Sequence, residues 1–349
     1  MKVRIKDIAR LAQVSPGTVD RVIHNRGEVS EKTREKVREI IEDLNYQPDI
    51  LARTLASKKS YQFAVLMPVS VNDNDFWNSP RLGIDKALNE VSPFGVQVRS
   101  YYFDQFDNSS FTEKSNQILR DNPDAILFAP VFPAESISFL QQCKEFNIPV
   151  ILFNSNLEEA EEVFYIGQDA LQSGYLGAKL LSYGLKSEGD ILIVNIAGRK
   201  DNHNHILRRE RGFRKYFADH PEIKSNVITI DCVQDCGENF DIQFSQALEK
   251  YTVRAAFVTN SRVYEVADYF EKRNIDTISL LGYDLLPQNT EALKKGIIDF
   301  LISQKPEQQG YMGIMTLFNK LVLQKYVSKK QYISIDIMTR ENIDYYEYK

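Results

Sequence analysis

Two short amphipathic helices joined by a tight turn begin this chain, and no other feature constrains its fold as strongly. The first helix is expected over residues 5–12, and the second follows within 14–22, which read VSPGTVDRV. Ser15 suits the N-cap of the second helix and Pro16 suits its first turn. The apolar residues that can close the hairpin recur at helical spacing, and they are Ile8, Ala9, Ala12, Val14, Val19 and Val22.

A third helix, capped by Ser30 and running over residues 33–44, completes a small all-α unit. Residues 1–60 contain 13 Lys and Arg against 9 Asp and Glu, so they carry +4, whereas residues 61–349 carry −9. A basic unit on an acidic body is expected when only that unit meets phosphate. The second helix would then present Gly17, Thr18, Asp20 and Arg21 to a DNA major groove. A helical bundle without such a role is the alternative.

The N-terminal sequence closely resembles the headpiece of the lactose-repressor (LacI/GalR) family of transcriptional regulators. The matching residues are Val14, Ser15, Thr18, Val19, Arg21, Val22, Val29, Ser30, Thr33, Arg34, Val37, Leu44, Tyr46, Pro48, Ala52, Arg53 and Leu55. Asp20 and Asp49 depart from the family's usual Ser and Asn. The resemblance implies that DNA is contacted by Ser15, Pro16, Gly17, Thr18, Arg21, Thr33, Arg53 and Leu55.

The segment 49–60 is expected to act as a hinge after a headpiece of residues 1–48. Asp49 can cap a helix over 50–57, but eight residues are too few for a helix to be stable alone in water. It should therefore fold only when paired with a second copy on DNA. By the resemblance, Leu55 enters the minor groove as a wedge, and Arg53 contacts phosphate. A homodimer on a near-palindromic operator in double-stranded DNA is the expected assembly.

Composition excludes several other classes of protein. No run of about 18 apolar residues exists, so no membrane span is expected. Charged residues recur from Lys2 to Arg10, which argues against a signal peptide. Three cysteines, Cys143, Cys232 and Cys236, leave an odd thiol and no disulfide framework. These patterns predict a cytoplasmic protein. Cys232 and Cys236 with His203 and His205 make only a weak metal pattern, so no metal or cofactor is expected.

The remainder, residues 61–349, alternates between strand-like and helix-like stretches. Strands are predicted near 63–68, 96–103, 125–129, 150–153, 164–166, 190–194, 227–231, 255–259, 278–282 and 300–303. Such alternation is typical of parallel sheets covered by helices on both faces, here as two Rossmann-like lobes. The region also resembles the type I periplasmic sugar-binding-protein fold, which implies discontinuous lobes. Lobe 1 would span about 61–165 and 304–326, and lobe 2 about 166–300 and 330–349.

Ligands bind such sheets beyond the carboxyl ends of the strands, where this sequence places aromatic, amide and charged residues. The predicted ligand-binding residues are Asp75, Phe76, Trp77, Asn154, Arg209, Asn260, Asp284 and Gln304. Aromatic rings can cover the apolar face of a pyranose, while amides and carboxylates bind its hydroxyls. Asn154 stands where sugar binders often place Asp.

The sequence therefore predicts a transcriptional regulator, interpreted as a repressor, that a sugar or other small molecule controls from a cleft between two lobes. A binding receptor without a regulatory role on DNA is the alternative in another class. An enzyme and a nucleoid-architectural protein are further alternatives. The enzyme lacks a motif, since no nucleophile elbow, Walker loop or HExxH helix occurs.

Overall fold

The computed structural model describes residues 4–23, 27, 29–44, 59–71, 75–160, 162–185, 189–197, 204–233 and 240–346. The chain divides into two compact units, Met1–Ser57 and Lys58–Lys349. The predicted hinge helix, with Arg53 and Leu55, lies outside the described residues, as do Cys236 and His203.

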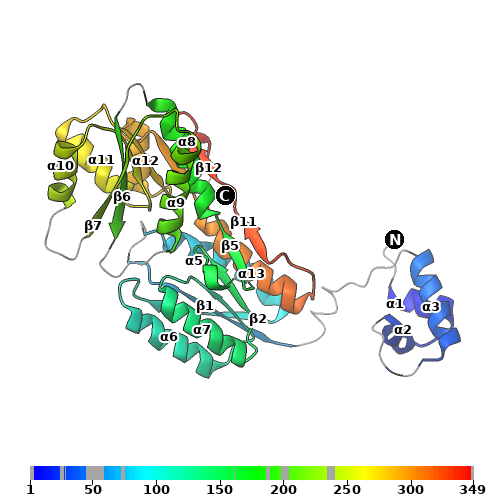
Figure 1. Cartoon of the computed structure of the whole chain (residues 1–349). Coiled ribbons are helices and arrows are strands. Elements are labelled where there is room, and N and C mark those ends of the chain that lie inside the picture. Colours follow the sequence, from blue (N-terminus) through cyan, green and yellow to red (C-terminus); the bar gives the residue numbers. More distant parts are fainter. Residues whose placement is uncertain are drawn as a thin grey trace. The chain divides into compact units, whose positions relative to one another are not determined.

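The N-terminal unit contains three helices, α1 (Ile5–Ala12), α2 (Pro16–Ile23) and α3 (Glu31–Asp43) (Figure 1). The Ser15 Oγ accepts a hydrogen bond from the Thr18 backbone N–H at 3.1 Å, which confirms Ser15 as the cap of α2. Ser30 caps α3 in the same way, through the Thr33 N–H at 3.3 Å. Between the helices lies a small core whose buried members are Ile8, Ala9, Ala12, Val19, Val22 and Val37.

The second unit consists of two α/β lobes, each built on a six-stranded sheet. The lobe 1 strands are β1 (Tyr61–Pro68), β2 (Val96–Phe103), β3 (Ala125–Phe128), β4 (Val150–Phe153), β5 (Phe164–Gly167) and β11 (Lys330–Tyr332). The lobe 2 strands are β6 (Asp190–Ala197), β7 (Val227–Val233), β8 (Val253–Val258), β9 (Ser279–Tyr283), β10 (Phe300–Ser303) and β12 (Asp336–Met338).

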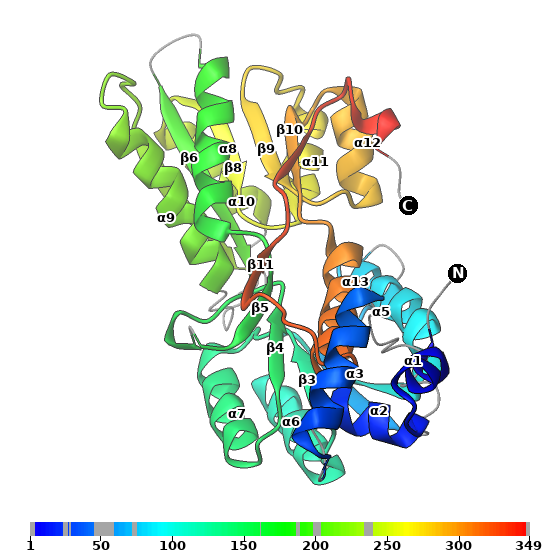
Figure 2. The same ribbon diagram turned by 90° about the vertical axis from the view of Figure 1, so that its right-hand side faces the viewer.

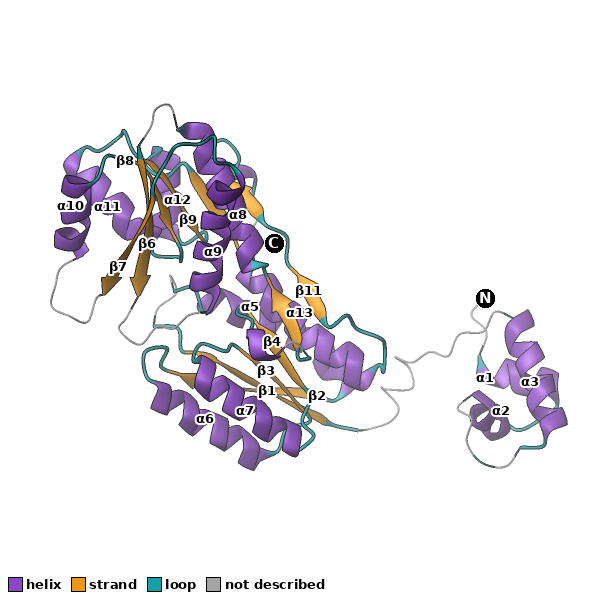
Figure 3. Cartoon of the chain, viewed as in Figure 1, coloured by secondary structure: helices purple, strands orange, loops and turns teal. Residues whose placement is uncertain are grey.

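Helices cover both faces of each sheet (Figures 1 and 3). In lobe 1 these are α5 (Asn78–Val91) and α13 (Pro306–Leu317) on one face, and α6 (Asn108–Asp121) and α7 (Pro133–Glu145) on the other. In lobe 2 they are α8 (Ala170–Gly184) and α9 (Asn204–Asp219), opposite α10 (Phe240–Lys250), α11 (Val263–Arg273) and α12 (Pro287–Lys295). Short turns of other helix are η1 (Ser92–Phe94), η2 (Glu158–Ala160), η4 (Phe318–Val322) and η5 (Ile343–Tyr345).

The strand order is β11-β5-β4-β3-β1-β2 in lobe 1 and β12-β10-β9-β8-β6-β7 in lobe 2. All neighbouring strands run parallel except β10 and β12, which are antiparallel. The ten predicted strands correspond to β1–β10, and the predicted two-lobed parallel α/β fold is confirmed. The buried strands are almost continuously apolar, as is typical of sheets covered on both faces.

The chain crosses between the lobes three times, and two crossings differ from the sequence-based placement (Figure 2). The first follows β5, which ends at Gly167, close to the boundary predicted between residues 165 and 166. The second follows β10, at residues 304–305, and lobe 2 extends beyond its predicted end near residue 300, because β10 pairs with β9 inside lobe 2. The third lies at 333–335, because residues 330–332 form β11 and pair with β5 of lobe 1. Lobe 2 therefore resumes near residue 336, not at 330.

Two further findings concern the described residues only. No helix in the described ranges combines the length and apolar character that crossing a membrane would need. No three His, Cys, Asp or Glu side chains in those ranges gather where they could hold a metal ion.

Candidate ligand cavity and DNA-reading surface

All eight residues predicted to bind a ligand line one cavity of about 320 Å³ between the two lobes. Lobe 1 contributes Asp75, Phe76, Trp77 and Asn154; lobe 2 contributes Arg209, Asn260 and Asp284; and Gln304 lies in the second crossover. Most of them follow the carboxyl end of a strand, where parallel sheets open toward solvent and ligands. A cavity of this size is in the range of small-molecule sites.

A chain of three polar side chains forms the lobe 2 side of the cavity. The Arg209 Nη2 donates to the Gln304 Oε1 at 2.5 Å, and the Gln304 Nε2 donates to the Asp284 Oδ2 at 2.7 Å. The Arg209 Nη1 also donates to the Thr259 carbonyl at 2.7 Å. Gln304 thus orients a cation and a carboxylate at once, although it carries no charge itself.

Two atoms of this chain have no hydrogen-bond partner within the part of the protein that the structure describes. They are the donor Nε of Arg209 and the acceptor Oδ1 of Asp284, and both atoms are buried. Burial raises the pKa of Asp284 to about 6, while the Arg209 charge and the Gln304 hydrogen bond act in the opposite direction. A buried donor and acceptor without partners favour a ligand that supplies hydroxyl groups.

Aromatic residues form the lobe 1 wall. Trp77 is 6% exposed, and its Nε1 donates to the Gln105 Oε1 at 3.2 Å. The Phe76 ring meets Trp77 edge to face at a centroid distance of 5.1 Å. The indole N–H is therefore satisfied by protein, and what Trp77 offers the cavity is apolar surface.

Asp75 and Asn260 hold the loops that carry them. The Asp75 carboxylate accepts the backbone N–H groups of Val71 at 3.0 Å and Trp77 at 3.2 Å. The Asn260 Nδ2 donates to the Ile196 carbonyl at 2.6 Å, and its Oδ1 accepts the Arg262 N–H at 3.1 Å. Both side chains fix the backbone at the rim of the cavity.

The sequence interpretation missed further cavity residues, among them Gln105, Phe106, Ser155, His205, Arg262, Tyr264 and Gln288. Gln105 and Phe106 follow β2, so the strand-end rule applied to every strand would have found them. The His205 Nδ1 lies 2.8 Å from the Ser155 Oγ, so this contact joins the two lobes. A local sequence pattern cannot predict it, because the two residues are 50 positions apart.

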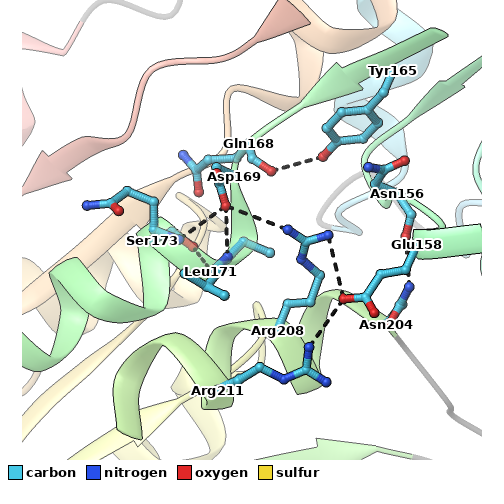
Figure 4. A network of polar contacts seen from close by, with 12 residues as sticks. Asn156, Glu158, Tyr165, Gln168, Asp169, Leu171, Ser173, Asn204, Arg208 and Arg211 are labelled. Atoms are coloured by element: carbon cyan, nitrogen blue, oxygen red, sulfur yellow. Dashed lines mark hydrogen bonds and ion pairs between the residues drawn. The ribbon is translucent and has the colours of Figure 1, made fainter. Parts of the chain in front are cut away.

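The first half of α9 makes other polar contacts with lobe 1 (Figure 4). The Asn204 Nδ2 donates to the Asn156 carbonyl at 3.0 Å. The Arg211 Nη1 donates to the Glu158 Oε1 at 3.3 Å, and Arg208 lies 3.9 Å from the same oxygen. The helix that carries Arg209 into the cavity therefore also touches lobe 1.

Four of the predicted DNA-reading residues in the described headpiece lie at the start of α2, while Arg21 lies in its last turn and Thr33 lies in α3. Ser15, Pro16, Gly17 and Arg21 are exposed, whereas Thr18 and Thr33 are half-buried. The Ser15 and Thr18 hydroxyl oxygens lie 2.9 Å apart, so these two side chains also stabilise the turn. Arg21 is the longest exposed donor on this face of α2.

A helix-turn-helix unit combined with a two-lobed α/β unit and an interlobe cavity defines a DNA-binding regulator with a ligand-binding domain. The family described as "Bacterial regulatory proteins, lacI family" matches residues 4–49, and the family described as "Periplasmic binding protein domain" matches residues 63–325. The chain belongs to the lacI family of bacterial transcriptional regulators, as its headpiece sequence indicated.

Several relatives are transcriptional regulators or repressors by name. The transcriptional regulator MalR of Streptococcus pneumoniae is 24% identical over 293 residues, which span 81% of this chain and 84% of MalR. The sucrose operon repressor of Streptococcus mutans is 28% identical over 63% of this chain and 64% of its own length. Catabolite control protein A of Staphylococcus epidermidis is 30% identical over 55% of this chain and 60% of its own length.

Solved structures match the second unit. A protein from Bacteroides fragilis assigned as a LacI transcriptional regulator is 31% identical, with a TM-score of 0.78 over 83% of this chain and all of that chain. A glucose-galactose binding protein from Geobacillus stearothermophilus is 20% identical, with a TM-score of 0.71 over 82% of this chain and 99% of its own. The second likeness concerns the fold alone.

Proposed function

We propose that this regulator is a repressor whose operator affinity is set by a sugar or sugar derivative bound in the interlobe cavity. One observation carries the proposal: the cavity combines an apolar Trp77 face with two buried polar atoms, the Arg209 Nε and the Asp284 Oδ1, that lack partners among the described residues. Pyranoses present an apolar face and a rim of hydroxyls. The apolar face suits Trp77, and the hydroxyls can bond to the Arg209 and Asp284 atoms.

The DNA side of the proposal is a homodimer on a near-palindromic operator, which implies a cytoplasmic location. Each headpiece reads one half-site through the exposed face of α2, with Arg21 at base edges or phosphate. The effector shifts the population between two relative orientations of the lobes. The size of this shift is set by how much more tightly the effector binds one orientation than the other. A binding receptor that does not act on DNA would leave the helix-turn-helix unit without a function. We propose no catalytic role.

A thermal-shift screen of the full chain against sugars, sugar acids and nucleobases tests the effector class. A ligand present at about 100 times its dissociation constant stabilises the folded state by about 2.7 kcal/mol, a readily measured shift. A sugar that shifts the wild type should fail to shift Trp77→Ala and Arg209→Ala. Phe146→Ala, which truncates an exposed side chain of lobe 1, is the control.

Operator binding supplies the second half of the test. Trp77→Ala and Arg209→Ala should bind operator as the wild type does without sugar, and should no longer respond to it. Normal sugar binding by both variants would show that the effector lies elsewhere. Loss of DNA binding without sugar would mean that these residues maintain the fold.

A further inference from the structure

The three crossovers between the lobes converge on a single side chain, Gln168. Its Nε2 donates to the Ser303 carbonyl at 3.0 Å and to the Ser334 carbonyl at 3.1 Å. Gln168 itself belongs to the first crossover, Ser303 is the last residue of β10 and directly precedes the second crossover, and Ser334 lies in the third. One side-chain amide of the first crossover therefore bonds to the residue that leads into the second crossover and to the third crossover. Figure 2 shows these three segments in green, orange and red where they pass between the lobes.

The burial and chemistry of Gln168 make this arrangement specific. The residue is only 4% exposed. In a glutamine side chain only the NH2 group donates, and its two N–H groups can satisfy two carbonyl acceptors together. The two acceptors therefore fix the orientation of the Gln168 amide. Its Oε1 is buried and has no hydrogen-bond partner among the described residues. An unsatisfied buried acceptor is destabilising. The two hydrogen bonds that the Gln168 Nε2 donates to carbonyls must therefore offset the cost of burying its Oε1.

The backbone of Gln168 is tied to the cavity as well. The Tyr165 hydroxyl lies 2.9 Å from the Gln168 carbonyl and 3.2 Å from the carbonyl of Asn154, and Figure 4 shows the first of these contacts. Asn154 lines the cavity, and Ser303 directly precedes Gln304, which binds Arg209 and Asp284. Gln168 thus lies between two segments that an occupant of the cavity would touch.

We infer that Gln168 is a positioning residue that fixes the spacing of the three crossovers and so limits which lobe orientations the protein adopts. Rotation of the lobes then occurs about this buried amide instead of by independent bending of three strands. Hinge closure in two-lobed proteins depends on a few residues that absorb the backbone change. The role of Gln168 in the hinge does not depend on the proposed function. Only its consequence, that the hinge transmits effector binding, rests on that function.

Distances between spin labels in the ligand-free full chain test this inference. Labels at Glu145→Cys in α7 and Lys272→Cys in α11 report on one lobe each, and both positions are exposed. The background replaces Cys143, Cys232 and Cys236 with Ala, and labelled chains are diluted with unlabelled ones. Pulsed electron paramagnetic resonance then gives the distribution of interlobe distances without any effector or DNA.

Gln168→Met has a similar size and cannot donate, so it should broaden the distribution at a melting temperature close to that of the parent. Gln168→Glu places a carboxylate oxygen against two carbonyl oxygens and should broaden it further. Gln331→Glu is the matched control, because the Gln331 amide donates to the Thr316 hydroxyl and the Ser328 carbonyl within lobe 1. It should leave the distribution unchanged.

An unchanged distribution in Gln168→Met would overturn the inference, and so would equal broadening in Gln331→Glu. If Gln168→Glu does not fold, Gln168→Met alone decides. Because the measurement uses neither sugar nor operator, its failure is distinct from failure of the proposed function, which the thermal-shift screen and operator binding address.

Discussion

The guanidinium carbon of Arg209 lies 3.6 Å from the centre of the Tyr283 ring, so this buried cation of the cavity lining rests on an aromatic face. The Tyr283 hydroxyl lies 3.0 Å from the Ser173 Oγ, which ties the ring to α8. A desolvated cation–π contact of this kind contributes up to about 2 kcal/mol. It helps to hold Arg209, to which no carboxylate of the described residues bonds directly.

Tyr283→Leu should weaken binding of the sugar selected by the screen, by as much as roughly thirtyfold, because Arg209 loses the ring that supports it. Tyr283→Phe keeps the ring and loses only the hydroxyl, so its affinity should remain close to that of the wild type. Calorimetric titration measures both. Equal losses in the two variants would show that the hydroxyl, not the ring, supports Arg209.

The buried carboxyl of Asp284 should make stability depend on pH. Its pKa rises from 3.8 to about 6 on folding because of burial, so the folded state binds more protons than the unfolded state between these values. Stability is therefore lost as the pH rises through this window. Asp284→Asn should gain stability relative to the wild type from pH 4 to pH 7, by up to about 3 kcal/mol. Urea denaturation at several pH values checks the sign.

The same titration should affect the effector in the opposite direction. The ionised carboxylate accepts sugar hydroxyls better than the protonated carboxyl does, so wild-type affinity should fall as the pH drops below about 6. The Asp284→Asn variant should bind more weakly at pH 7 and show a flat profile over this interval. A sloping profile in the variant would assign the titration to another group.

Gly174→Ala should disturb the cavity indirectly, through the packing of α8 against the helix that carries Arg209. A Cβ at Gly174 in α8 would lie 1.9 Å from the carbonyl oxygen of Arg209 in α9, so the two helices would have to separate. Overpacking of this kind typically costs about 1–3 kcal/mol, and here it also displaces Arg209. Gly184→Ala is the control in the same helix, since its nearest neighbour is the Ser279 hydroxyl at 3.3 Å.

The measurements for Gly174→Ala are the denaturation midpoint and the sugar affinity. Both should fall in this variant, while Gly184→Ala should change neither by much. A stable Gly174→Ala with normal affinity would mean that α8 and α9 can move apart freely.

Arg21→Ala should weaken operator binding, because Arg21 is exposed on the face of α2 that carries Pro16 and Gly17. If it reads a base, specific binding falls by about 1–3 kcal/mol and the preference at one operator position relaxes. If Arg21 contacts only phosphate, the affinity for all DNA sequences falls alike. The slope of log affinity against log salt concentration then becomes shallower by about one. Selection from random DNA followed by salt titration separates the two, with Arg38→Ala in α3 as control.

Local patterns in the sequence were sufficient for the headpiece helices and for strands β1–β10, because caps and apolar runs act over a few residues. They were insufficient for β11 and β12, which are three-residue edge strands reading KQY and DIM, too short and too polar to show periodicity. That omission displaced the last lobe boundary. Asp284 and Gln304 could be predicted from their place after strands, whereas the role of Gln168 could not, since its partners lie 135 and 166 residues away.

The threefold crossing has a consequence for synthesis of the chain on the ribosome. The lobe 1 sheet is made early, but α13, which packs against β3, β4 and β5, and the edge strand β11 come only after almost all of lobe 2. A nascent chain that ends before residue 306 therefore exposes the part of its first sheet that α13 covers, at β3, β4 and β5, and such a state is prone to aggregation. Neither lobe can be completed before the last strands emerge, so premature termination near the C-terminus should leave two unfinished lobes instead of one intact lobe.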